Sequence, residues 1–319
     1  MDNQIQGNNT LSSQVNENVP DVSIILVCWN NKNYLEPCLR SLYDGCMHSR
    51  FDVVVVDNGS TDGSQAMLRE MFPLVQIIQN DHNVGLSRAS NQGIMVTHGR
   101  YVLLLNNDTL VNCSCIDSMI EFLDVNPKTG AVGGQLLNPD GSFQGGYAEF
   151  STLLEEFMIA TRLGELIGQG YPSHGDTSQP KSVGWLSSAC LLLHRAALDQ
   201  VGLLDEEYFI YGDEADLQYR LNKAGWNVYY LPGVSTIHFG GRSMNRWSRR
   251  KMVYRGKMLF YKKNYGPLRT VALRTMFFGL SFAKLMSWGV TFFMPRWRER
   301  ARLELKSNLD VLRLCLNLE

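Results

Sequence analysis

The sequence lacks three features that would place the chain outside the cytoplasm or across a membrane. Residues 1–19 have neither the basic stretch nor the apolar stretch of a signal peptide, and their Asn, Gln and Ser content predicts a disordered tail. The seven cysteines are odd in number and contain no C-x2-C pair. In the apolar segment 268–295 the longest uncharged stretch has 11 residues, whereas a spanning helix needs about 20. We therefore expect a reduced, cytoplasmic chain.

Basic residues are scarce in the first 241 residues, and acidic residues are scarce in the rest of the chain. From Arg242 to the end there are 18 Lys and Arg but only 4 Asp and Glu, while the first 241 residues hold 12 basic and 27 acidic groups. Such asymmetry indicates that the C-terminal region meets something anionic, such as phospholipid head groups. Alternatively, the basic region packs on the acidic part and neutralises it, and both can hold.

The first third of the sequence alternates apolar runs with helical patterns. Buried strands are predicted at 22–29, 53–56 and 100–105, a further strand at 74–79, and helices at 34–45, 62–71 and 88–96. This alternation predicts an α/β fold with a mainly parallel sheet and helices on both faces. Ligands bind beyond the carboxyl ends of such strands. Asn30, Asp57 and Asp108 follow three of these strands, which points to a site at that edge.

The pattern changes after Asp108. Residues 130–150 are Gly-rich and hairpin-like, 151–168 have a helical pattern, and 169–182 form a polar loop. A strand at 183–194 precedes a helix at 217–224 that ends at Gly225, a residue typical of a C-cap. Short strands at 227–231 and 237–239 close the predicted domain.

Several polar residues in this order could carry chemistry. Asp108, at the mouth of a buried strand, suits a hard divalent cation such as Mg²⁺ or Mn²⁺, which would in turn hold a diphosphate. Asp213, Glu214 and Asp216 follow an aromatic run, and burial raises the pKa of a carboxylate toward the range of a general base. A surface cluster is the alternative. His238 becomes a ligand candidate only if it meets Asp108 in space.

Five ordered motifs resemble the family 2 glycosyltransferases, in particular the rhamnosyltransferase-like enzymes of bacterial polysaccharide synthesis. They span about residues 22–265 and read VSIILVCWNN, VVVVDNGSTDGS, NVGLSRASNQGI, YVLLLNNDTL and YFIYGDEADLQYRLNKAGWNVYYLPGVSTIHFGG. The resemblance implies a GT-A (Rossmann-like) fold, with a nucleotide-binding half at about 20–110 and an acceptor half at about 111–241. It also implies inverting transfer of a sugar from a nucleotide donor.

The resemblance assigns roles to single positions. Val27, Trp29, Asn30 and Asp57 correspond to the pocket for the donor base and ribose, and Gly85 and Arg88 to positions near the nucleotide. Asn106-Asn107-Asp108 corresponds to the D-x-D metal motif, with Asn106 in place of its first carboxylate, so that Asp108 is the main acidic ligand.

The second half of the motif set is matched in the same way. His238 resembles the second metal ligand of some members. Glu214 stands where the family usually has an Asp general base, which leaves Asp213 and Asp216 as alternative bases. Trp185 resembles an acceptor-side aromatic residue, although a core Trp fits as well.

The C-terminal region 242–319 is predicted to be helical, basic and amphipathic. On a helical wheel Arg274, Ser281, Lys284 and Thr291 fall within about 100°, and the remaining face is apolar. Followed by RWRERAR at 296–302, this pattern is typical of a helix at a membrane interface. A core-packing helix and a spanning helix with a buried Lys are the alternatives. The apolar content is too high for a nucleic-acid-binding arm.

Together these patterns predict an inverting, metal-dependent glycosyltransferase at the inner face of the cell membrane. Its donor would be a dTDP- or UDP-type sugar, with rhamnose as a candidate, and its acceptor a saccharide or a lipid-linked saccharide. A sugar nucleotidyltransferase is a second hypothesis, but the first loop, Cys28-Trp29-Asn30-Asn31-Lys32, is not the Gly-rich basic loop that a triphosphate needs. A non-catalytic nucleotide-sugar-binding module is a third.

Overall fold

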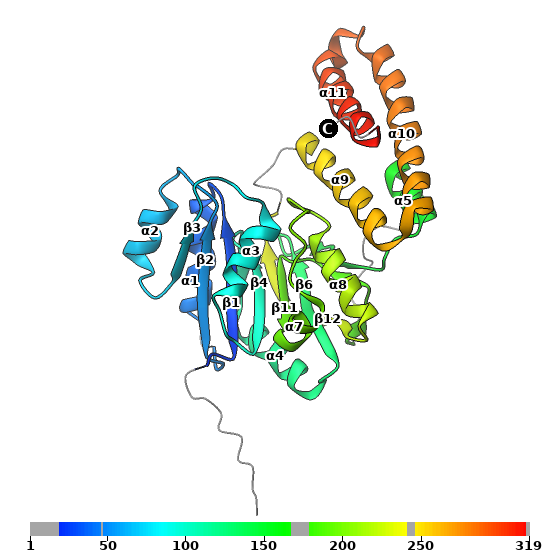
Figure 1. Ribbon diagram of the computed structural model, residues 1–319. Helices are drawn as coiled ribbons and strands as arrows, with labels where there is room; N and C mark the ends of the chain where they lie inside the picture. Colours follow the sequence, from blue (N-terminus) through cyan, green and yellow to red (C-terminus); the bar gives the residue numbers. More distant parts are fainter. Residues whose placement is uncertain (1–18, 46, 167–178, 241–245, 317–319) are drawn as a thin grey trace, which may run out of the picture.

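A computed structural model describes residues 19–45, 47–166, 179–240 and 246–316. Four parallel strands form one half of the main sheet, in the order β3-β2-β1-β4 (Figure 1). They are β1 (Val22–Cys28), β2 (Phe51–Asp57), β3 (Gln76–Gln79) and β4 (Tyr101–Asn106). Their Val, Ile and Leu content explains why β1, β2 and β4 are buried on both faces. These four strands lie where the sequence predicts them, whereas the single strand predicted over 183–194 is two strands, Trp185–Leu186 and Cys190–His194, in different sheets.

The other half of the sheet is mixed. Strand β11 (Cys190–His194) pairs antiparallel with both β4 and β6 (Thr129–Leu137), and β6 pairs parallel with β12 (Asn227–His238). At the edge, β12 pairs antiparallel with β5 (Thr109–Val111). Four two-residue strands complete the β structure: β7 (Phe143–Gln144), β8 (Tyr147–Ala148), β9 (Lys181–Ser182) and β10 (Trp185–Leu186). The predicted strands at 227–231 and 237–239 are one strand with an irregular register between Leu231 and Ser235.

Helices cover both faces of the sheet because side chains alternate along each strand. In β1, Ile24 and Leu26 join one core cluster and Ile25 joins the other. The first cluster is closed by α1 (Lys32–Tyr43), α2 (Ser64–Met71) and α4 (Cys113–Val125). The second is closed by α3 (Leu86–Met95), α7 (Arg195–Val201) and α8 (Asp213–Lys223).

Two predicted helices need correction. The helix predicted over 151–168 is α5 (Leu153–Thr161) and α6 (Leu163–Leu166), because Arg162 between them takes a left-handed conformation with φ of 61°. Helix α8 begins at Asp213, not at Leu217. Its first turn holds all three acidic residues of the cluster, and the amide-rich start of a helix favours negative charge. The predicted tail and most of the polar loop at 169–182 lie outside the described residues.

Three long helices form the C-terminal region: α9 (Arg246–Asn264), α10 (Gly266–Thr291) and α11 (Arg298–Cys315). They lie together beyond one end of the sheet, with α5 beside α10 (Figure 1). Their core contains Tyr261 from α9 and Leu273 and Phe277 from α10. In the described part of the chain, no helix is long and apolar enough to cross a membrane.

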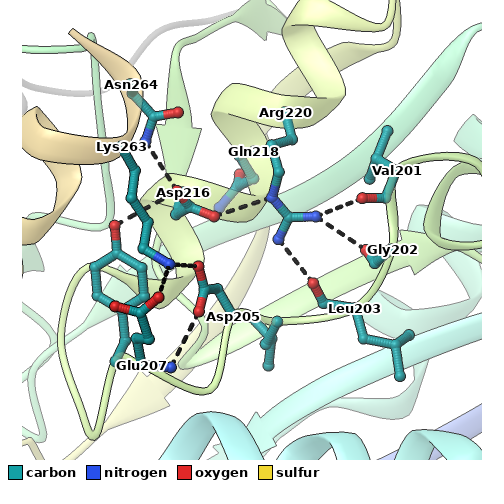
Figure 2. A network of polar contacts seen from close by, with 12 residues as sticks. Val201, Gly202, Leu203, Asp205, Glu207, Asp216, Gln218, Arg220, Lys263 and Asn264 are labelled. Carbon is teal, nitrogen blue, oxygen red and sulfur yellow. Dashed lines mark hydrogen bonds and ion pairs between the residues drawn. The ribbon is translucent and has the colours of Figure 1, made fainter. Parts of the chain in front are cut away.

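Polar contacts fasten α9 to the sheet domain (Figure 2). The Lys263 ammonium pairs with the carboxylates of Asp205 and Glu207, and Asn264 Nδ2 donates to Asp216 Oδ1 at 2.8 Å. Nearer the middle of α9, Lys257 Nζ lies 2.5 Å from Glu156 Oε2, which belongs to α5. Part of the basic charge at the C-terminus therefore neutralises acidic groups of the preceding domain, as one of the two sequence-based alternatives proposed.

Two phenylalanines of α10 provide a test of the C-terminal core. Phe277 is buried and Phe282 is half exposed. We expect Phe277→Ala to lower the free energy of unfolding by about 3–5 kcal/mol, because it leaves a cavity among α9, α10 and α5. Phe282→Ala on the same helix should cost less than about 1 kcal/mol. Denaturant unfolding measures both, and equal losses would contradict this packing.

Candidate active site

Asp108 and His238 meet at the edge where β4 ends. The antiparallel pairing of β5 with β12 places His238 opposite Thr109, and the Phe239 amide donates to the Asp108 carbonyl at 2.9 Å. This brings His238 Nε2 to 3.3 Å from Asp108 Oδ1 and to 3.3 Å from Asn106 Nδ2. Residues 130 positions apart in the sequence thus form one site, which was the condition set for His238 to be a ligand candidate.

Gln144 in β7 fixes the orientation of the His238 ring. Its Nε2 donates to Asn138 Oδ1 at 2.9 Å and to the His238 carbonyl at 3.1 Å. Both partners are acceptors, so the Gln144 oxygen must face the ring, 2.6 Å from Nδ1. His238 Nδ1–H therefore donates to Gln144, and Nε2 presents its lone pair on the side of Asp108.

The geometry of this pair fits a divalent cation. Neighbouring ligands of an octahedral ion with bonds of about 2.1 Å lie about 3 Å apart, close to the 3.3 Å between Asp108 Oδ1 and His238 Nε2. Among the residues that the structure describes, no three His, Cys, Asp or Glu side chains gather into a metal-binding group. Two protein ligands would leave the remaining positions to water and to oxygens of a bound ligand, as is usual for Mg²⁺.

A pocket of about 550 Å³ opens beside Asp108. Its size is within the range of small-molecule sites. Eight of the residues predicted from the sequence line it: Val27, Trp29, Asn106, Asn107, Asp108, Trp185, Glu214 and His238. Residues from both predicted halves thus face one cavity.

Asn30 and Asp57 are not among the lining residues. Asn30 has a positive φ of 51°, and its side chain accepts from the Thr61 amide at 2.7 Å. The Asp57 carboxylate is fully buried and accepts from Gln65 Nε2 at 2.5 Å and from the Ser60 amide. Both side chains hold the turn after β2 in place, next to the pocket. Contact with the donor base remains a prediction for them.

Gly85 and Arg88 also lie outside the lining. Gly85 has a φ of 95°, and a Cβ there would meet the Phe209 backbone at 2.9 Å, so only glycine lets these two loops approach. Arg88 is mostly exposed, with its Nε 3.7 Å from Glu206 Oε2. A nucleotide contact by Arg88 likewise remains a prediction.

The three carboxylates of the first turn of α8 occupy different surroundings. Glu214 lines the pocket, and its Oε2 accepts from the Gly212 amide at 3.2 Å. Asp216 is buried and bonded to Arg220, Asn264 and Tyr208 (Figure 2). It joins α8 to α9 and does not line the pocket.

Asp213 is buried behind the pocket. One of its oxygens has no hydrogen-bond partner, and the side chain lines a small cavity of about 20 Å³, roomy enough for about one water molecule. Burial, followed by the charge of the neighbouring Glu214, raises the pKa of Asp213 well above its usual range. Asp213 therefore holds its proton at pH values at which an exposed carboxyl is ionised.

The sequence reasoning assigned no site role to eleven of the lining residues, and one of these eleven, Arg249, carries a charge. Arg249, from the first turns of α9, lines the pocket, and its guanidinium lies 5.6 Å from the centre of the Tyr211 ring. The sequence marks residues 242–319 as basic but gives no sign of which cation turns back toward the α/β domain. That information lies in the packing of α9.

Solved structures establish the class of fold. The chain is similar to a mannosyltransferase from Pyrobaculum calidifontis solved with GDP-Man and Mn²⁺, with a TM-score of 0.57, 14% identity and coverage of 94% of this chain and 88% of that one. It is also similar to GalNAc-T7 solved with UDP, GalNAc and Mn²⁺, with a TM-score of 0.54, 15% identity and coverage of 77% and 50%. The fold is of the GT-A class, as the motifs predicted.

The sequence places the chain within that class. The family profile described as Glycosyl transferase family 2 matches residues 23–202, more than half of the chain. The chain belongs to this family of glycosyltransferases.

Two curated relatives add detail. An N-acetylglucosaminyl-diphospho-decaprenol L-rhamnosyltransferase of Mycobacterium tuberculosis is 29% identical over 243 residues, which cover 70% of this chain and 77% of the relative. The O-antigen biosynthesis protein RfbC of Myxococcus xanthus is 28% identical over 237 residues, 69% of this chain and 17% of that protein.

The raised pKa of Asp213 predicts a pH-dependent effect of Asp213→Asn. Below the unfolded pKa of about 3.9 both states hold the proton. As the pH rises, the unfolded chain releases its proton first, so the folded state loses stability until the pH passes the raised folded pKa. The variant avoids this loss of about 1.4 kcal/mol per pH unit.

Melting temperatures of both proteins between about pH 4 and about pH 8 test this prediction. The stability of the Asp213→Asn variant relative to the wild type should rise across this range. A difference that stays constant with pH would contradict it.

Proposed function

We propose that this glycosyltransferase is inverting and metal-dependent, and that it moves a sugar from a dTDP- or UDP-type donor to a saccharide or lipid-linked acceptor in surface polysaccharide synthesis. The observation that carries the proposal is the pocket that Asp108, His238 and Glu214 share. The name of the mycobacterial relative supports rhamnose as the sugar and a lipid diphosphate as the acceptor anchor.

Asp108 and His238 are the residues that would hold the cation, Mg²⁺ or Mn²⁺. Bound there, it would supply positive charge to the donor diphosphate as the sugar leaves. Arg249 places a second positive charge at the pocket. Trp29, 42% exposed at the rim, offers an aromatic face to the donor base, while Asn107 is held by the Val27 carbonyl at 2.7 Å.

Glu214 acts as the general base in this proposal. It accepts the proton of the acceptor hydroxyl while the hydroxyl oxygen bonds to the anomeric carbon and the bond from that carbon to the diphosphate oxygen breaks. A single displacement from the opposite face inverts the anomeric centre. The Gly212 amide orients the Glu214 carboxylate, and Trp185 across the pocket is the candidate platform for the acceptor sugar.

The alternatives make different demands on the same pocket. A sugar nucleotidyltransferase would need cationic and amide-rich groups for a triphosphate at the first loop, where the lining residue is Trp29. A non-catalytic sugar-binding module needs no general base, whereas the pocket retains in Glu214 a carboxylate that can accept a proton. We also propose that the protein works at the inner face of the cell membrane, peripherally bound through its C-terminal region.

Glu214→Gln tests the base. The variant should lower the transfer rate by about 10²–10⁴-fold, because the amide cannot accept the acceptor proton. Binding of dTDP or UDP with Mn²⁺ should persist, as seen by thermal shift. Glu121→Gln, on the exposed side of α4, is the matched control. A fully active Glu214→Gln variant would exclude Glu214 as the base.

Gln144→Leu tests the metal site without relying on turnover. Removing the acceptor for His238 Nδ1–H frees the ring to rotate or change tautomer, so Mn²⁺ affinity should fall about 10–100-fold. Electron paramagnetic resonance of free Mn²⁺ in the presence of nucleotide measures it. The exposed Gln76→Leu should leave the affinity unchanged. An unchanged affinity in Gln144→Leu would remove His238 from the proposed ligand set.

A further inference from the structure

Past its first turn, helix α10 turns both of its charged side chains toward the protein, whereas Arg269 in the first turn is exposed. Arg274 donates to two backbone carbonyls at the end of α11, at 3.1 and 3.2 Å. Lys284 Nζ donates to the Ala160 carbonyl of α5 at 2.8 Å, and Ser281 is buried. Arg274 and Lys284 are the only charged residues between 270 and 295, and both side chains point into the C-terminal bundle. The polar sector predicted from the sequence is thus the inward face.

The outward face of α10 is apolar. Its exposed large side chains recur at steps that keep them on one side of a helix, and the exposed face continues into the turn before α11. They are Leu268, Val271, Phe282, Met286, Val290, Phe293 and Met294. Val290 is 68% exposed and Phe293 80% exposed, a large amount of apolar surface to leave in water.

A cluster of arginines adjoins this face. Arg296, Arg298 and Arg300 follow the turn, and all are exposed. Their guanidinium groups lie 5.5–5.8 Å from the ring centres of neighbouring aromatic side chains, among them Trp297 and Phe292. Arginine and tryptophan beside an apolar strip are the groups that settle at the boundary between lipid head groups and acyl chains.

We propose that the outward face of α10 and the turn after it dock in the surface layer of an anionic phospholipid bilayer. From Leu268 to Val290 the face extends about 33 Å at 1.5 Å per residue, enough to lie along the membrane plane. A lipid surface satisfies both the apolar strip and the arginines.

The docking face suits the proposed function. Arg249 of α9 lines the pocket, so the pocket lies at the end of the sheet domain that meets the C-terminal helices. A bilayer along α10 would therefore bring a lipid-linked acceptor to the end of the molecule that holds the pocket (Figure 1). Only this last step rests on the proposed function, because docking itself needs no turnover.

Flotation of the full chain with lipid vesicles tests the docking face. Wild type should bind vesicles of phosphatidylcholine containing phosphatidylglycerol. The double variant Val290→Gln/Phe293→Gln should bind at least about tenfold more weakly, because both side chains would no longer gain from burial. The matched control Leu74→Gln/Val125→Gln changes two equally exposed apolar residues of the sheet domain and should bind like wild type.

A second variant tests the charge. Arg296→Gln/Arg298→Gln/Arg300→Gln should weaken binding to the anionic vesicles by about fivefold per arginine and leave binding to pure phosphatidylcholine unchanged. The proposal is overturned if wild type does not float with anionic vesicles, or if the Val290→Gln/Phe293→Gln variant floats equally well. A wild-type dimer that this double variant dissociates, without vesicle binding by either protein, would assign the face to a second copy instead.

Nucleotide binding separates the failure of this proposal from failure of the proposed function. The Val290→Gln/Phe293→Gln variant should keep the thermal shift that wild type shows with Mn²⁺ and dTDP or UDP, because both residues lie outside the pocket. A wild type that floats with vesicles but gives no shift would retain the docking face and contradict the proposed function. If wild type shows the thermal shift but does not float with vesicles, the proposed function stands and the docking face is contradicted.

Discussion

The antiparallel pairing of β5 with β12 is the constraint on which the site depends. It places His238 opposite Thr109 and so brings an imidazole to the carboxylate that ends β4. One hydrogen bond, from the Phe239 amide to the Asp108 carbonyl, closes the arrangement. Without it the chain would present a single carboxylate beside two asparagines, a poor site for a divalent cation. The mixed half of the sheet therefore supplies His238 beside the Asp108 carboxylate, which stands at the end of the parallel half.

The C-terminal helices are attached to the α/β domain near the pocket. Asn264 bonds to Asp216 of α8 and Lys263 to Asp205 in the loop before α8, which fixes the end of α9, and the beginning of α9 supplies Arg249 to the pocket. The pair of Lys257 with the buried Glu156 extends this attachment to α5. The basic charge of the C-terminus is thus divided between internal pairing, the pocket and the exposed arginines after α10.

The first half of the fold could be predicted because its local signals agree. β1, β2 and β4 are unbroken β-branched and leucine runs, each followed by polar turn residues. The short strands β7 to β10 could not be predicted from two-residue patterns, since their pairing depends on distant partners. Helix α5 was expected to continue past Arg162, where the left-handed backbone of a non-glycine residue gives no sequence signal.

The site also contains residues that could be predicted from the sequence and residues that could not. Motif spacing identified Asp108, Glu214 and His238, and the pocket brings them together. It did not identify Gln144, whose role depends on the pairing of β7 with β6, or Arg249, which a helix folded back from the C-terminus delivers. Asp57 and Asn30 share the edge but turn their side chains to the neighbouring turn. Sequence order thus predicts which strand ends meet, whereas side-chain direction follows from packing.

The most direct test is a crystal structure with Mn²⁺ and dTDP or UDP, with anomalous diffraction used to locate the metal. The account predicts one anomalous peak within bonding distance of Asp108 Oδ1 and His238 Nε2, with diphosphate oxygens completing its coordination and Gln144 still bound to Nδ1. A nucleotide bound in the pocket without that peak, or a peak at the Asp213–Asp216 cluster, would contradict it.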